Sequence, residues 1–315
     1  MGRAEILNAL LDGVSRKDLA ARAAKQSLCY RAKGTSQGIE DEADALAYVR
    51  ARAPATQAVA AVVLARAMAV MGDFAPASLL DVGAGPGSAS WAAADLWPRI
   101  AVTMLDRNAA LRALAAKLMP DATILAGDLV GPKPACDLVM ANYVLAEFPL
   151  NAAARIARDL WEGAKQMLVL VEPGTPDGFA RIRAARAALI EAGAHVAAPC
   201  THDKECPMLA RSVGESRSDQ NKSDWCHFSV RVQRSRDHLI LKDAHVPFED
   251  ERYSYVVVTR EPKAKGARII KPPVEAKPGI TLPLCDSSGL RNEFVARRDK
   301  DAFKGARKLA WGDRY

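Results

Sequence analysis

The chain has 315 residues, of which 50% are hydrophobic and 26% charged, so it can bury a sizeable core and hold one large domain with extensions. We find no run near the ~20 apolar residues of a membrane span, and the first 20 residues lack the features of a secretory signal. We therefore expect a cytoplasmic protein that stays off membranes and is a monomer when free. The net charge is +7, and residues 200–315 supply most of it, with 23 Lys and Arg against 17 Asp and Glu.

Three regions follow one another along the chain. Residues 1–75 are rich in Ala, Leu, Arg and Glu with helical spacing, and Pro54 fits the first turn of a helix through QAVAAVVLARAMAV. Residues 76–195 alternate short apolar runs with amphipathic stretches, which indicates βα units and a parallel sheet. Residues 196–315 are cysteine-rich and basic, and their segments HLILKD and YSYVVVTR should add late strands to that sheet.

The clearest motif is LLDVGAGPG, a strand that ends in a D-x-G-x-G-x-G loop and opens a helix. Its glycines let the backbone turn sharply and approach a ligand beside the free N–H groups of the helix. The spacing resembles motif I of class I S-adenosylmethionine methyltransferases, whereas G-x-G-x-x-G would suit the pyrophosphate of NAD; a nicotinamide-dependent Rossmann enzyme is therefore the alternative. Following strand order, we expect Asp106 to bind the ribose and Asp128 to contact the adenine. The predicted cofactor residues are Asp81, Gly83, Gly85, Gly87, Asp106, Asp128 and Asn142.

Catalytic residues are harder to predict. The fourth strand ends in Asn142-Tyr143-Val144 without the two prolines common in amino-methylating enzymes, and Cys136 lacks the second cysteine of a base C5-methylating enzyme. Glu147 and His195 could act as general bases, although neither belongs to a recognisable constellation. We therefore leave the catalytic residues unassigned.

Four cysteines suggest a bound metal. Three of the six cysteines fall within residues 200–226, and four thiolates can hold zinc or an iron–sulfur cluster in a loop-rich region. The C-x5-C spacing fits neither the usual zinc ribbon nor the ferredoxin runs, so spacing alone leaves the metal open. Disulfides and scattered free thiols are the alternatives. The candidate ligands are Cys200, Cys206, Cys226 and Cys285.

Taken together, these segments resemble the methyltransferase-like small-ribosomal-subunit assembly proteins, known from mitochondria and with bacterial relatives. The resemblance covers nearly the whole chain and rests on residues 48–56, 81–87, 171–176, 199–207, 224–228 and 311–313. It implies a [4Fe–4S] cluster on Cys200, Cys206, Cys226 and Cys285, with zinc as the other metal, and binding to the small ribosomal subunit during assembly. Methyl transfer is undemonstrated in that family.

The basic tail is the candidate RNA-binding surface. Phosphate contacts would use its charges, and exposed bases could stack on Phe294, Phe303 and Trp311. The alternative is a terminal helix with a solvated charged face whose aromatic side chains dock on the main domain. The candidate RNA-binding residues are Arg297, Arg298, Lys304, Arg307 and Lys308.

Two functions therefore compete. The first is an rRNA-binding assembly factor that uses the methyltransferase fold and the cluster as scaffolding, which the missing catalytic loop favours. The second is an active S-adenosylmethionine-dependent rRNA methyltransferase, which the complete glycine loop keeps open.

Overall fold

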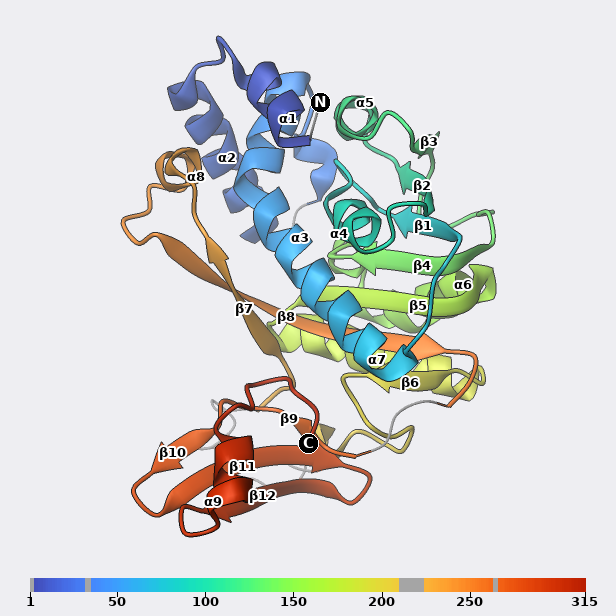
Figure 1. Cartoon of the computed structure of the whole chain (residues 1–315). Helices are drawn as coiled ribbons and strands as arrows, with labels where there is room; N and C mark the ends of the chain where they lie inside the picture. The colour runs from blue at the N-terminus through green and yellow to red at the C-terminus, as the bar shows by residue number, and fades with distance from the viewer. Residues whose placement is uncertain (1–2, 32–34, 210–223, 263–265) are drawn as a thin grey trace.

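The computed structural model describes residues 3–31, 35–209, 224–262 and 266–315, and its centre is a mixed eight-stranded sheet (Figure 1). The strands lie in the order β3-β2-β1-β4-β5-β8-β6, and β7 pairs with the first half of β8. Their bounds are β1 Ser78–Val82, β2 Ala101–Asp106, β3 Thr123–Ala126, β4 Cys136–Asn142, β5 Ala164–Pro173, β6 His195–Ala198, β7 Phe228–Gln233 and β8 Phe248–Thr259.

Strand direction confirms the predicted class I methyltransferase sheet. Strands β1 to β5 run parallel, whereas β8 lies antiparallel between β5 and β6. This is the arrangement of the class I methyltransferases. The chain order reverses between β1 and β4, and in open α/β sheets the carboxyl ends of the strands form a ligand crevice at that point.

Helices cover both faces of the sheet. On one face α3 (Glu42–Met71), α4 (Ser88–Leu96) and α5 (Ala109–Leu118) pack on alternate residues of β1, β2 and β4, and on the other α6 (Ala153–Gly163) and α7 (Pro176–Glu191) do so. Pro54 lies inside α3 and not in its first turn, so the helix starts earlier than predicted, where Asp41 caps the amide of Asp44. Residues 42–71 thus belong to the methyltransferase core. The predicted helical region 1–75 is therefore divided between this core helix and the N-terminal helices that precede it.

Helix α3 is long and apolar enough to cross a membrane by length and composition alone. Its buried side chains include Val59, Val63 and Leu64, which pack in the same cluster as sheet residues such as Leu79 and Leu138. A third of its most apolar 18-residue window is buried in this way, as expected of a helix that covers a sheet with one face.

The N-terminal helix α1 (Arg3–Leu11) contacts α5, and α2 (Arg16–Arg31) packs on α3. Helix α8 (Arg236–Leu241) packs on α2 at the end of the β7–β8 ribbon (Figure 1). The strand predicted at HLILKD is therefore wrong. Ser235 caps α8 by accepting from the His238 amide, and His238 and Leu241, three residues apart, form its buried side. That spacing suits a helix better than a strand.

Residues 266–315 form a second, smaller sheet, seen at the bottom of Figure 1. It contains β9 (Arg268–Ile269), β10 (Val274–Ala276), β11 (Gly279–Asp286) and β12 (Gly289–Ala296), and α9 (Lys300–Ala306) covers it. Buried residues of β9, β11, β12 and α9 form a core of their own, whereas β10 is exposed. The predicted third region therefore divides, with β6, β7 and β8 in the main sheet. Short one-turn helices η1 (Ser36–Gly38), η2 (Leu145–Glu147), η3 (Leu150–Ala152) and η4 (Pro207–Leu209) complete the described elements.

Candidate cofactor cavity and cysteine site

The glycine loop leaves β1 in a conformation that requires glycine. Gly83, Gly85 and Gly87 have φ values of 68°, 56° and 91°, which favour glycine over other residues. The amides of Gly83 and Ala84 donate to the Leu105 carbonyl at the end of β2, at 2.8 and 3.2 Å. A Cβ on Gly83 would lie 2.5 Å from the Val144 side chain. The loop is thus held tightly between the ends of β2 and β4.

Two carboxylates stabilise this loop. Asp106, at the end of β2, accepts from the amides of Gly85 and Asn108, each at 2.7 Å. Asp81 accepts from the amide and hydroxyl of Ser90 in α4, at 3.1 and 2.7 Å. Burial raises the pKa of Asp81 to about 6, and burial also raises the pKa of Asp106. Both side chains therefore already hold the loop and the first turn of α4, and the ribose contact of Asp106 stays a prediction.

A cavity of about 1140 Å³ opens at the carboxyl ends of β1, β2, β4 and β5. Its wall includes six of the seven predicted cofactor residues, while α2 and α3 add Tyr30, Tyr48 and Arg52. Gly87 is absent from this wall. A Cβ there would lie 2.7 Å from the Met104 sulfur, so Gly87 serves the packing of α4. The predicted cofactor residues on the wall are Asp81, Gly83, Gly85, Asp106, Asp128 and Asn142.

The floor of the cavity carries buried polar atoms that lack partners within the described residues. They are both side-chain atoms of Asn142, the Tyr143 hydroxyl and Oε2 of Glu172. Tyr143 has a φ of 62°, a strained value for a tyrosine, and its amide donates to the Val171 carbonyl at 2.7 Å. Buried unpaired polar groups are rare and, like backbone strain, cluster at ligand sites. The floor is thus suited to a polar ligand.

Glu172 is the buried carboxyl of this floor. Its Oε1 accepts from the Leu145 amide at 2.9 Å, and the side chain has no solvent exposure. Burial raises its pKa to about 8, so the side chain is mostly a neutral acid at pH 7 and can donate a hydrogen bond. Sequence reasoning missed Tyr143 and Glu172 as site residues. An acidic residue at the end of a buried apolar strand was the available signal for Glu172.

The two candidate general bases lie in different places. Glu147 lines the cavity but accepts from the Ser36 amide at 3.1 Å and from Arg107 at 2.6 Å. His195, on β6, lies outside the cavity wall and pairs with Asp203 at 2.8 Å. These bonds hold neighbouring loops together, so neither geometry supports a free base.

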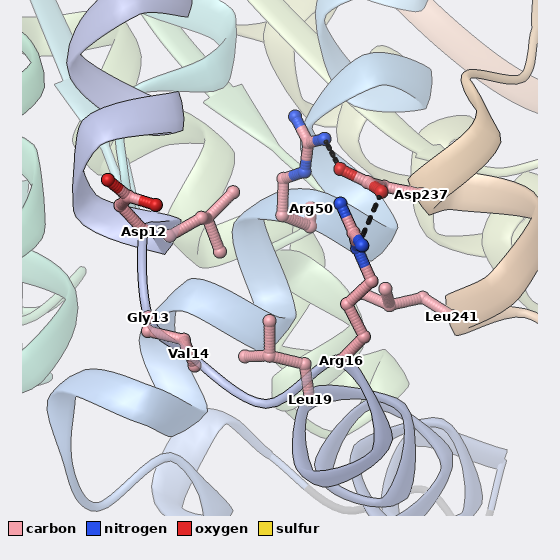
Figure 2. A pocket seen from close by; sticks show the side chains of 9 residues that line it. Asp12, Gly13, Val14, Arg16, Leu19, Arg50, Asp237 and Leu241 are labelled. Atoms are coloured by element: carbon pink, nitrogen blue, oxygen red, sulfur yellow. Dashed lines mark hydrogen bonds and ion pairs between the residues drawn. The ribbon is translucent and has the colours of Figure 1, made fainter.

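A second cavity of about 410 Å³ lies between the α1–α2 turn, α3 and α8 (Figure 2). Asp237 accepts from Arg16 at 3.1 Å and from Arg50 at 2.6 Å across it. Arg16, Arg50 and Asp237 therefore satisfy one another, and these ion pairs hold α8 against α2 and α3.

The four candidate ligand cysteines come from distant segments, yet they lie near enough to shift one another's pKa. Burial raises the pKa of Cys226 well above its ordinary value, and the charges of the other three cysteines raise it further. Burial and the charges of Cys200 and Cys206 raise the pKa of Cys285 to about 12. Within the described residues, however, no group of three or more His, Cys, Asp or Glu side chains is close enough to hold a metal ion. The thiols therefore gather in one region without forming a single-ion site.

The basic tail is only partly available to RNA. Arg297 and Arg307 pair with Glu275 at 3.0 and 3.6 Å, and Arg297 also lies over the Phe303 ring. Phe303 is buried in the small sheet, and Trp311 packs edge-on against His227. Of the three aromatic side chains, Phe294 alone is strongly exposed, at 51%. The prediction that exposed bases stack on the rings of Phe303 and Trp311 is therefore wrong. Of the five candidate RNA-binding residues, the three that are exposed and do not pair with Glu275 are Arg298, Lys304 and Lys308.

Comparison with known proteins places these features in a family. The model of a family described as mitochondrial small ribosomal subunit Rsm22 matches residues 42–315. The human mitochondrial ribosome assembly protein METTL17 is 27% identical over 91% of this chain and 62% of its own length. An Rsm22-cox11 tandem protein of Schizosaccharomyces pombe is 27% identical over 95% of this chain and 46% of its own length.

The chain thus spans less than two thirds of these relatives. Among solved structures, a putative RNA methyltransferase from Pyrococcus horikoshii is 14% identical, with a TM-score of 0.42 over 66% of this chain and 84% of its own. The fold assignment rests on strand order, whereas the family model covers most of the chain. The chain belongs to the family of the mitochondrial small ribosomal subunit protein Rsm22.

Proposed function

We propose that the protein is an assembly factor that binds rRNA of the small ribosomal subunit. The observation that carries this proposal is the family match, which runs through α3, the glycine loop, the cysteines and the tail. The human relative is named for ribosome assembly. The methyltransferase fold would act mainly as a scaffold, because Glu147 is hydrogen-bonded on both oxygens and His195 lies away from the cavity.

S-adenosylmethionine is the proposed ligand of the large cavity. The glycine loop would carry it beside Asp106, and Asp128 and Asn142 lie farther along the same wall. The unpaired atoms of Asn142 and Glu172 support a polar ligand on the floor. When bound, this cofactor supplies an electrophilic methyl group. The chain's own residues would orient it and exclude water, since the floor is buried.

A [4Fe–4S] cluster is the proposed group of the cysteine site. The donor set supports it: Cys200, Cys206 and Cys285 lie near enough to raise the pKa of Cys226, and four cysteine thiolates are the usual ligands of such a cluster. Cys200 follows β6, Cys206 precedes η4, Cys226 precedes β7 and Cys285 lies in β11. Ligation would therefore fasten the small sheet to the main one, which is a structural role.

An active rRNA methyltransferase is the second candidate, and the cavity floor favours it. An acceptor amine could donate to Asn142 beside the Tyr143 ring, while neutral Glu172 donates to an acceptor atom. Calorimetry with S-adenosylmethionine and its demethylated product tests the site. Folded protein that gives no heat of binding with either compound would eliminate this candidate.

The assembly role is tested by pulling the protein from cells and sequencing the bound RNA. We expect enrichment of small-subunit rRNA over large-subunit rRNA. Metal and sulfide analysis on the same sample checks the cluster: equal iron and sulfide supports it, and stoichiometric zinc without iron refutes it.

A further inference from the structure

Two buried arginines hold the segments that carry the cysteines. Arg186, in α7, donates from Nη2 to the carbonyls of His202 and Lys204, at 2.7 and 2.8 Å. Both carbonyls lie in the loop between Cys200 and Cys206. The arginine is 6% exposed, so it fixes this loop from within the protein.

Arg268 does the same between more distant segments. It lies on β9 directly opposite Cys285 of β11 in an antiparallel pair, which puts the two side chains on one face of the small sheet. Its Nε donates to the Pro199 carbonyl at 2.7 Å, next to Cys200, and Nη1 donates to the Gly312 carbonyl at 2.9 Å. One side chain therefore links two cysteine-bearing segments to the C-terminal turn.

Neither arginine is fully satisfied within the described residues. Nε of Arg186 and Nη2 of Arg268 are buried without a partner, as are the Thr201 hydroxyl and both ring nitrogens of His202. The hydrogen bonds that both arginines make go to backbone carbonyls, which carry no full negative charge. Arg268 is 3% exposed, and a buried charge is costly unless an opposite charge lies near.

The cysteine thiols lie near both arginines. Arg186 favours the ionised form of Cys206 and Cys285, and Arg268 favours that of Cys226. Burial and mutual repulsion outweigh these attractions, because the pKa of each of the three thiols is still raised. The site thus places buried N–H donors, unpartnered among the described residues, in the region of the four cysteines.

We propose that Arg186 and Arg268 are positioning residues for the iron–sulfur cluster: they hold its ligand loops in place, offer free N–H groups to its sulfur atoms and offset its negative charge. The inference rests on the cluster assigned under the proposed function. A cluster has bridging sulfides that can accept these hydrogen bonds, whereas four-coordinate zinc offers only its four thiolates.

The charges also set a redox property. Reduction adds one negative charge to the cluster, so a nearby positive charge stabilises the reduced form and raises the reduction potential. Replacing either arginine with a neutral residue should lower the potential. We expect at least a tenfold shift in the reduction equilibrium, which for one electron is about 59 mV.

The experiment compares anaerobically purified wild-type protein with the Arg186→Gln and Arg268→Gln variants. Iron and sulfide per chain are measured first, and then the potential by a spectroscopically monitored redox titration. Arg158→Gln is the matched control, because Arg158 pairs with Glu191 on the outer side of α6 and α7 and is half exposed. We expect lower iron occupancy and a lower potential in both test variants and wild-type values in the control.

Two further variants separate charge from folding. Arg186→Lys and Arg268→Lys keep the charge, so their potentials should stay close to wild type even where the Gln variants fail to fold. A Lys variant whose reduction equilibrium shifts tenfold, or Gln variants with wild-type iron content and potential, would overturn this inference and leave the proposed cluster standing. Wild-type protein that carries zinc and no iron would overturn the cluster and the inference together.

Discussion

Glu172 makes the stability of this protein depend on pH in a way that one substitution can isolate. Its carboxyl is fully buried at the cavity floor, and burial raises the pKa from its ordinary 4.5 to about 8. Between these values the folded state keeps a proton that the unfolded state has lost. Stability contributed by Glu172 is therefore complete below pH 4.5 and is lost as the pH rises through 8.

The magnitude follows from the two pKa values. Ionising a carboxyl whose pKa has moved from 4.5 to about 8 costs up to about 5 kcal/mol of unfolding free energy. Glu172→Gln keeps an oxygen that can accept from the Leu145 amide but cannot ionise. The variant should therefore gain stability relative to wild type as the pH rises from 5 to 8.

The assay is urea unfolding of the cofactor-free wild type and the variant at pH 5, 6, 7 and 8. Taking the difference at each pH cancels the other titrating groups, including Asp81, whose pKa is about 6. A difference that stays constant across this range would show that Glu172 is ionised in the folded protein. The floor would then lack the proposed hydrogen-bond donor.

Three other changes test the remaining features. Gly85→Ala should weaken S-adenosylmethionine binding in calorimetry while destabilising the fold by only about 1–2 kcal/mol, because its new Cβ meets nothing nearer than Leu111 at 3.9 Å; unchanged affinity would argue against backbone approach at this position. Cys200→Ser and Cys226→Ser should each lose iron and sulfide and become less soluble, since a structural ligand contributes folding free energy; full iron content in both would remove them as ligands. In rRNA binding, a triple variant that replaces Arg298, Lys304 and Lys308 with Gln should reduce the slope of log affinity against log salt by about 2, at roughly 0.7 per single-stranded phosphate contact. A double Gln variant at Arg297 and Arg307, which pair with Glu275, should change this slope less. Equal slopes in both variants and the wild type would place the RNA contact elsewhere.

Much of the core could be predicted from the sequence because its signals are local. A strand followed by a glycine-rich turn and a helix fixes where the cofactor loop lies, and parallel strands bring their carboxyl ends to one edge. Strand order predicts that Asp106 binds the ribose and Asp128 contacts the adenine; both line the cavity, and the two contacts stay predictions. Gly87 belongs to the same motif but lies against the core beside Met104, and the spacing of the glycines does not predict this difference.

The rest depends on contacts between distant residues. Arg268 reaches a carbonyl 69 positions away, and such a bond leaves no periodic pattern in the sequence. Strands β9 and β10 of the small sheet are only two and three residues long and are separated by Lys and Pro, so no periodic pattern predicts them. Phe303 and Trp311 were interpreted as exposed rings because composition does not show which side chains dock on a neighbouring sheet.

The most direct test of the central claim is co-sedimentation of the purified protein with isolated ribosomal subunits at physiological salt. We predict that the protein sediments with small-subunit particles, especially immature ones, and stays in the supernatant with large subunits. Equal binding to both subunits, or binding to neither by a folded protein with full iron content, would contradict the proposed assembly role.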